Sequence, residues 1–164
     1  MFNKMHRLFF IIPVIAVASL AVCGNIKVNS VQAPGYSEKI DKVLILENRG
    51  LADKYPMLSD RTGLVIQKLK TNFEENKIPV DSEKVSAFTL NTNSIRNASN
   101  ASHILSVTVT TAQVRVHVDY YSLLLTLTDK KTGKEVWKST VDANWYSKPD
   151  EIANSITKQL LVAR

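Results

Sequence analysis

The chain has 164 residues, of which 45% are hydrophobic and 22% are charged, and it contains a single cysteine. This length fits one globular domain with a short appendage, and one cysteine excludes an intramolecular disulfide scaffold and a cysteine-rich zinc site. The formal net charge of +6 falls to +4 once Lys4 and Arg7 of the N-terminal segment are set aside. A surplus this small does not indicate a nucleic-acid partner.

Residues 1–22 have the pattern of a secretory signal peptide. A short basic start precedes an uncharged apolar run that begins at Leu8, and Cys23 follows where this run ends. Two other interpretations stay open. The uncharged stretch from Leu8 to Ile26 is close to the length of a spanning helix, which would make it an uncleaved anchor. The other interpretation is simple secretion, with cleavage of the signal peptide after Ala16–Ala18.

The segment Leu20–Gly24, with the sequence Leu-Ala-Val-Cys-Gly, resembles a bacterial lipobox. In that motif, a leucine three residues before the cysteine and a small residue just before it direct cleavage at a lipid-modified cysteine, and Val22 departs from the usual small residue. The resemblance implies acylation of Cys23 by palmitate-like chains, each stabilised in a membrane by about 0.8 kcal/mol per buried methylene. Because Gly24 is not the aspartate that favours the inner membrane, it also implies an outer-membrane lipoprotein facing the periplasm.

Residues 23–40 are expected to form a lipidated tether, and residues 41–164 a single α/β domain. Gly24–Lys39 mixes polar residues with Pro34-Gly35 and shows no sustained hydrophobic period. A flexible segment of this length would give the domain a reach of roughly 20–25 Å from the membrane.

The first half of the domain predicts two strands around one long helix. The apolar run Val43–Leu46 is typical of a strand covered on both faces, hence central in its sheet. A one-faced amphipathic helix is predicted from about Asp60 to Asn76. Lys84–Leu90 predicts a second strand, and the Asn- and Ser-rich stretch Asn91–Ser102 predicts a loop or a short irregular helix.

From His103 onward, apolar and polar residues alternate as they do in β-strands. Three alternating segments are expected, at residues 105–109, 114–118 and 121–127. Their parity changes twice, which requires a turn or bulge near Thr111–Gln113 and another near Asp119–Tyr120. Asp129–Lys134 predicts a hairpin loop that leads into a returning strand over Glu135–Ala143.

A final helix is predicted to begin near Ser147–Asp150, where the sequence resembles a capping box. Together, these elements predict an α/β (α+β) two-layer sandwich. It has a mixed, mostly antiparallel sheet of four or five strands, with two helices packed on one face.

This arrangement resembles a group of small Gram-negative periplasmic lipoproteins. The group includes relatives of the penicillin-binding-protein activators, the curli-secretion lipoprotein and the N-terminal domain of the Tol translocation protein. Five segments carry the resemblance: Lys42–Glu47, the helix with Leu64, Leu69 and Phe73, Ala101–Val109, Leu127–Trp137 and Ile152–Val162. The motif Asp-x-x-Thr-Gly-x-x-Val-Trp before a final helix is the group's commonest sequence trace. The chain is too short for the pore-forming insertions of the curli-secretion lipoprotein.

No catalytic motif stands out in the sequence. Gly-rich phosphate loops, His-Glu-x-x-His and suggestively spaced carboxylates are all absent. We therefore expect no enzyme, no cofactor, no metal site and no small-molecule substrate. His103 follows a polar loop and is expected at the surface. Arg115, His117 and Asp119 alternate on one predicted strand face, which is either a solvated face or a contact stripe.

Aromatic residues gather near the predicted strand ends. Trp137 lies in an alternating strand and is expected in the core, whereas Trp145 and Tyr146 precede the last helix and are the first candidates for partner contact. The leading hypothesis is a non-enzymatic lipoprotein that binds a protein or another envelope component, through the aromatic helix entry or a sheet edge. The alternative is a structural subunit of a larger envelope secretion or transport assembly.

Overall fold

The computed structural model of the protein describes residues 26–86, 92–114 and 118–162; the predicted signal peptide and Cys23 lie outside these ranges. The elements follow in chain order: β1 (Ile26–Gln32), β2 (Val43–Asn48), the short 3-10 helix η1 (Ala52–Lys54), α1 (Pro56–Glu75), β3 (Val80–Val85), α2 (Thr92–Ala98), β4 (His103–Val114), β5 (Val118–Asp129), β6 (Glu135–Asn144) and α3 (Pro149–Val162).

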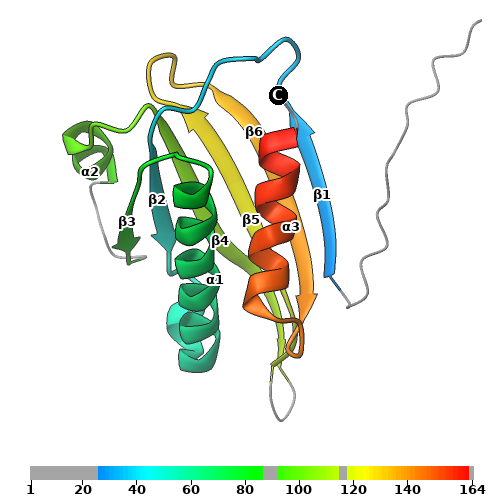
Figure 1. Ribbon diagram of the computed structural model, residues 1–164. Coiled ribbons are helices and arrows are strands. Elements are labelled where there is room, and N and C mark those ends of the chain that lie inside the picture. Colours follow the sequence, from blue (N-terminus) through cyan, green and yellow to red (C-terminus); the bar gives the residue numbers. More distant parts are fainter. Residues whose placement is uncertain (1–25, 87–91, 115–117, 163–164) are drawn as a thin grey trace, which may run out of the picture.

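The strands form one mixed sheet in the order β1-β6-β5-β4-β2-β3 (Figure 1). β2 runs parallel to both β3 and β4, whereas all other neighbours are antiparallel. Val43–Leu46 of β2 are all buried, as expected for a strand covered on both faces. The mixed, mostly antiparallel sheet is therefore confirmed. It has six strands rather than the four or five predicted.

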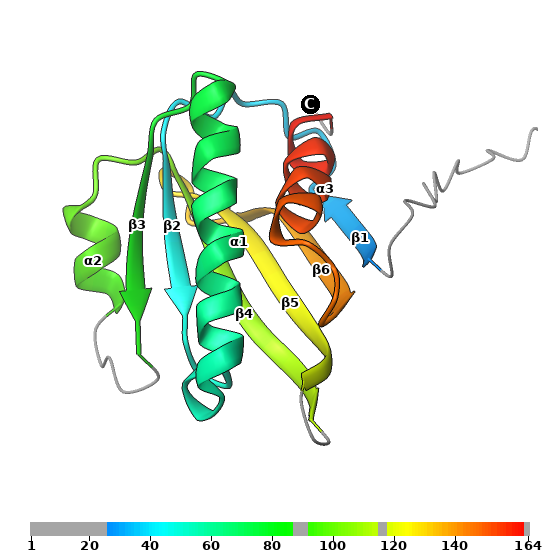
Figure 2. The same ribbon diagram turned by 60° about the horizontal axis from the view of Figure 1, so that its bottom comes forward.

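α1 and α3 pack side by side on one face of the sheet (Figure 2), as predicted for two helices. The third helix, α2, covers the opposite face, where Ile95 packs against Leu44, Leu46 and Ile104. The crossover through α1 steps outward from β2 to β3, and the crossover through α2 steps back from β3 to β4. Crossovers between parallel strands are almost always right-handed, so two that step in opposite directions place their helices on opposite faces.

The main hydrophobic core lies between the sheet and the pair α1 and α3. Phe73, Leu125 and Ile156 are fully buried there, one each from α1, β5 and α3. Trp137 is also buried, which confirms its predicted place in the core. Each such side chain stabilises the fold by about 1.5–3 kcal/mol through the apolar surface that it removes from water.

β1 lies inside the range 23–40, so the prediction of a tether is wrong for residues 26–32. This strand pairs antiparallel with β6, and Ile26 lies opposite Ala143. The sequence of this strand does not alternate between buried apolar and exposed polar residues. Ser30 is half-buried and donates a hydrogen bond to Gln159 Oε1 (2.9 Å), while Val31 is 74% exposed. A polar residue inside and an apolar residue outside removed the signal that period-2 patterns provide.

The expected strand over residues 114–118 is also wrong. Val114 ends β4 and Val118 begins β5, and the two residues pair with each other across antiparallel strands. The first parity change has the predicted cause, because the register shifts between Val109 and Thr111. Arg115 and His117 fall outside the described residues.

Two element boundaries differ from those predicted. β3 begins at Val80, four residues before the predicted start at Lys84, because it pairs in parallel with β2 from Val43↔Val80 to Asn48↔Val85. Residues 87–90 of the predicted strand lie outside the described residues. α1 begins four residues before Asp60, at Pro56, because proline is favoured in the first turn of a helix, where its missing N–H is not needed.

The predicted hairpin between β5 and β6 is confirmed, and Asp129 organises it. Its carboxylate accepts hydrogen bonds from the Lys131 backbone N–H (2.8 Å) and the Thr132 hydroxyl (2.9 Å). Gly133 follows at φ +69°, a left-handed conformation that suits glycine. Burial alone would raise the pKa of Asp129, but these hydrogen bonds, with His103 nearby, hold that pKa below its ordinary value.

Candidate functional site

A groove of about 760 Å³ runs between α1 and the edge strand β3. It lies on the face of the sheet that α1 covers; Figure 2 shows the position of this helix over the sheet. The helix lines it with residues from Ser59 to Glu74, and the sheet contributes Glu47, Ser82 and Lys84. Most of these side chains are polar or charged. The groove therefore suits a ligand that carries charge and hydrogen-bonding groups.

Glu47 lies at the inner wall of this groove, and only 3% of its surface is exposed. It stands opposite Lys84 in the β2–β3 register, and its Oε2 is 4.0 Å from Lys84 Nζ. Its Oε1 is buried and has no hydrogen-bond partner among the described residues. Burial raises the pKa of Glu47, and the charges of Lys84 and Arg49 only partly oppose this effect.

Arg49, the other nearby cation, is already engaged. Its Nε is 3.1 Å from Asp53 Oδ1, and its guanidinium donates a hydrogen bond to the Ser59 hydroxyl (2.6 Å). The carboxylate of Glu47 thus has one distant ion pair, with Lys84. A buried carboxylate is stable as an anion when donors or cations surround it, so this one is under-compensated.

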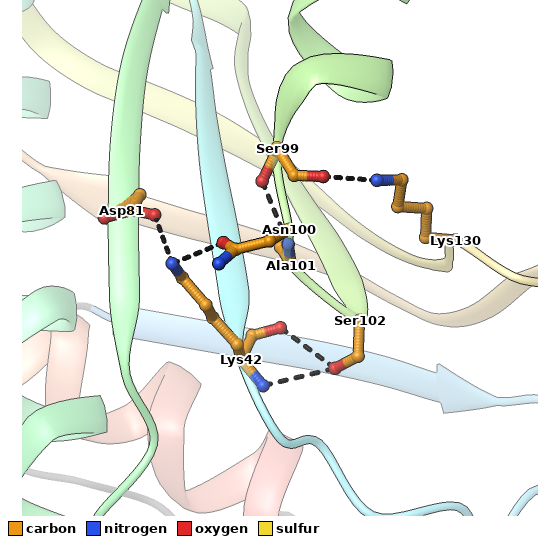
Figure 3. Close-up of polar contacts among 7 residues, drawn as sticks. All are labelled: Lys42, Asp81, Ser99, Asn100, Ala101, Ser102 and Lys130. Carbon is orange, nitrogen blue, oxygen red and sulfur yellow. Dashed lines mark hydrogen bonds and ion pairs between the residues drawn. The ribbon is translucent and has the colours of Figure 1, made fainter.

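The opposite face of β3 borders a second recess of about 550 Å³, against α2. Figure 3 shows the contacts that fix the segment between α2 and β4 beside it. Lys42 Nζ forms an ion pair with Asp81 (2.8 Å) and donates a hydrogen bond to Asn100 Oδ1 (2.5 Å). Ser102 donates to the Lys42 carbonyl (3.0 Å), and Lys130 donates to the Ser99 carbonyl. These contacts hold the recess in shape.

His103 is buried, with 2% of its surface exposed, so its predicted surface position is wrong. Its ring contacts the Tyr36 hydroxyl through Nε2 and the Ser102 hydroxyl through Nδ1 (2.9 Å). The histidine opens β4 between Val43 and Asp129 of the neighbouring strands, which explains its burial. The cluster ties the segment that joins β1 and β2 to the sheet.

The aromatic pair before α3 divides into one internal and one exposed residue. Trp145 packs against the main core, and the guanidinium of Arg61 lies 4.9 Å from the centre of its ring. Arg61 also donates a hydrogen bond to the Ser147 carbonyl. Tyr146 is 79% exposed. A partner role for this pair stays a prediction.

Of the predicted stripe Arg115, His117 and Asp119, only Asp119 lies within the described residues, so a contact role for this stripe stays a prediction. Asp119 belongs to β5, beyond the Val114–Val118 pair where β4 gives way to β5, and the other two residues lie outside the described ranges. Cys23 lies outside them as well. No group of His, Cys, Asp or Glu suited to a metal ion occurs within the described ranges. No helix in that part of the chain has the length and apolar character needed to cross a membrane.

The groove residue Glu47 was not singled out in the sequence. Its only local signal is its position directly after the buried run Val43–Leu46, where a charged residue is expected to mark the solvated end of a strand. Its burial depends on three distant elements, because α1 covers it and β3 and β4 flank β2.

No protein-family profile and no curated protein sequence matches the chain. Among solved structures, the fold is similar to the PelC dodecamer from Paraburkholderia phytofirmans, at a TM-score of 0.50 and 20% identity, covering 83% of this chain and 94% of that chain. Lipoprotein GNA1162 from Neisseria meningitidis matches at a TM-score of 0.34 and 16% identity, covering 74% and 96% of the two chains. Protein CT253 from Chlamydia trachomatis matches at a TM-score of 0.43 and 11% identity, covering 74% of this chain and 94% of that chain.

The likeness to PelC shows a shared α/β fold over nearly the whole of that chain. The expected architecture is therefore confirmed at the level of the fold. The specific lipoprotein groups that the sequence resembles stay a prediction, because no family profile matches.

Proposed function

We propose that the protein is a non-enzymatic outer-membrane lipoprotein whose domain faces the periplasm and binds a protein of the cell envelope. The observation that carries this proposal is the open edge of the sheet at β3, which lies between two recesses. Edge strands offer unpaired N–H and C=O groups, and many proteins bind other polypeptide chains along such edges. The lipobox-like segment Leu20–Gly24 supports the location.

In this proposal, the lipid anchor holds one end of the sheet close to the membrane. Ile26, the first residue of β1, comes three positions after Cys23, a separation of at most about 11 Å. Ile26 pairs with Ala143, so the anchored end is the one where β6 ends and the exposed Tyr146 follows. Tyrosine is enriched at membrane interfaces, which makes the bilayer a second candidate contact for Tyr146.

Metabolic labelling with palmitate tests the anchor. We expect the wild-type chain to take up label and to fractionate with the outer membrane. The Cys23→Ser variant should take up none and should accumulate in the soluble periplasmic fraction or as unprocessed precursor. Label retained by the variant would overturn the lipoprotein assignment.

Site-specific photocrosslinking in cells tests partner binding. A photoreactive amino acid at position 82, on the open edge of β3, should give an adduct of discrete mass. The same amino acid at position 75, an exposed site on α1 away from the groove, is the matched control. Equal adducts from both positions, or none from either, would count against binding at this edge.

A second candidate function is that of a subunit in an oligomeric envelope assembly. The similarity in fold to a protein that forms a dodecamer favours it. Size-exclusion chromatography with light scattering, on the full chain in detergent at several concentrations, separates the two candidates. A discrete oligomer of this chain supports the subunit role, and a monomer at every concentration contradicts it.

A further inference from the structure

The edge strand β3 directs a defined set of backbone groups away from the sheet. The carbonyl of Pro79 accepts a hydrogen bond from the Val43 N–H, and that of Val85 accepts one from the Arg49 N–H, both at 3.0 Å. Alternate residues of a strand direct their backbone groups to opposite sides. The backbone N–H and C=O groups of Val80, Ser82 and Lys84 therefore point away from β2. No strand lies beyond β3 in the described part of the chain.

The two recesses lie on the two faces of this same edge. Ser82 and Glu83 line both the groove beside α1 and the recess beside α2. Side chains of an added strand would alternate between the two faces, so successive residues would enter opposite recesses. The edge therefore fits an extended polypeptide better than it fits a compact ligand.

The two recesses differ in chemistry. The recess beside α2 has an apolar wall of Leu44, Ile95 and Ala98, and its other lining residues are polar or charged: Lys70, Asp81, Ser82, Glu83 and Ser99. Three acidic side chains line the groove beside α1 (Glu47, Asp60 and Glu74), together with two ammonium groups (Lys70 and Lys84). The side chain of Glu83 alternates to the other face, because its register partner Leu46 lies on the side of α2. The groove beside α1 has one carboxylate more than it has ammonium groups, which favours a cation, and the recess beside α2 offers an apolar wall next to charged residues.

Glu47 supplies a specific anchor for that cation. Its Oε1 is buried at the groove wall without a hydrogen-bond partner among the described residues. The one ammonium near it belongs to Lys84, whose side chain is 64% exposed and whose Nζ is 4.0 Å from Oε2. An Arg or Lys side chain that enters from the open edge would form a charge-assisted hydrogen bond with Oε1, which is among the stronger polar interactions in proteins.

We propose that the β3 edge binds an extended segment of a partner protein as a seventh strand. In this arrangement, an Arg or Lys of the segment pairs with Glu47 in the groove beside α1, and its apolar neighbours enter the recess beside α2. The inference rests on the proposed function that the domain binds an envelope protein, and it adds the edge, the binding mode and the residue pattern of the partner.

Titration calorimetry and amide NMR on the full chain in detergent test this proposal. The probe is the capped peptide Thr-Val-Arg-Val-Thr, and its counterpart has Gln in place of Arg. We expect amide shifts centred on Val80–Lys84, and affinity at least tenfold higher for the Arg peptide. Glu47→Gln should abolish that preference, whereas Glu75→Gln, at an exposed site that does not line the groove, should preserve it.

The strand pairing itself is tested without relying on a protein variant. The Arg peptide methylated on alternate backbone nitrogens cannot donate to the β3 carbonyls, so it should lose most of its affinity. Ser82→Pro should also abolish binding, and because the Ser82 N–H faces away from β2, the thermal midpoint should fall little. Equal binding of the methylated peptide, or of the Arg and Gln peptides, would overturn the proposal.

Failure of this inference is distinguishable from failure of the proposed function. If no probe peptide binds while crosslinking to a partner persists at another surface, only the β3 site is wrong. If Ser82→Pro instead abolishes self-association of the full chain, the occupant is a second copy, which overturns the assignment to a partner protein. Loss of both peptide binding and all crosslinked adducts would contradict both proposals.

Discussion

Asp129 and Glu47 are buried to the same extent, each with 3% of its surface exposed, but their pKa values move in opposite directions. Asp129 lies in the antiparallel part of the sheet, where its own hairpin supplies an N–H and a hydroxyl as donors. Glu47 lies in the parallel part, where one of its oxygens has no partner among the described residues. Burial dominates the pKa of Glu47, whereas hydrogen-bond donors and His103 outweigh the effect of burial on the pKa of Asp129.

The surroundings of Asp129 form a structural region, whereas those of Glu47 form a region available for binding. In the antiparallel part, a short local turn satisfies the buried charge, so the carboxylate stabilises the fold. In the parallel part, the groups around Glu47 come from α1, β2 and β3, and the open side of β3 leaves room for another molecule. A carboxylate that is under-compensated in the free protein gains most from an external cation.

Replacement of the structural carboxylate should have the largest effect. Asp129→Ala leaves the Lys131 N–H and the Thr132 hydroxyl without their acceptor, and hydrogen bonds to a charged group contribute about 1.5–3 kcal/mol each. Water that enters the vacated site replaces part of this loss. We expect the free energy of unfolding at pH 7, measured in urea, to fall by about 1–3 kcal/mol.

The pH dependence of this loss has a definite sign. Because the folded-state pKa of Asp129 is lowered, its stabilising contribution is present above its ordinary value of 3.8 and is lost as the pH falls through the folded-state pKa. The difference in the free energy of unfolding between wild type and Asp129→Ala should therefore become smaller in acid. Glu135→Ala is the matched control, because its ion pair with Lys138 is exposed and should contribute little. A difference that grows in acid would contradict this account.

Elements whose signal is local could be predicted from the sequence. β2 was recognised from four consecutive apolar residues, and the hairpin after Asp129 from its Thr-Gly pair. Trp137 was placed in the core from period-2 alternation. In each case, the residues that reveal the element are the residues that form it.

Features that depend on distant partners could not be predicted. β1 was missed because Ser30 is satisfied by Gln159, which lies 129 positions later in the chain. The polar loop before His103 predicts a surface position, whereas the contact of its ring with Tyr36 joins segments 67 positions apart. Glu47 acquires its groove only when α1 and β3 pack around β2, which no short sequence pattern encodes.

Removal of the charge of Glu47 should have a smaller effect, with the opposite dependence on pH. Its folded-state pKa is raised, so its stabilising contribution is complete below the ordinary value of 4.5 and is lost as the pH rises through the folded-state pKa. Relative to wild type, Glu47→Gln should therefore gain stability, by up to about 1 kcal/mol, between pH 4.5 and pH 8. Urea unfolding at both pH values measures the change, and a relative loss would contradict it.

The smallest effect on stability is expected from Lys84→Met. The Lys84 ammonium is the cation that lowers the pKa of Glu47 most, so its removal should raise that pKa further. The pair joins Glu47 to a mostly exposed side chain, so stability should change by less than about 0.5 kcal/mol. Carboxyl carbon NMR would follow the titration, with Lys68→Met as the control, since its partner is the exposed Asp150. A Glu47 pKa at or below 4.5 in the wild type would remove the contrast with Asp129, because the carboxylate would then be fully compensated within the fold.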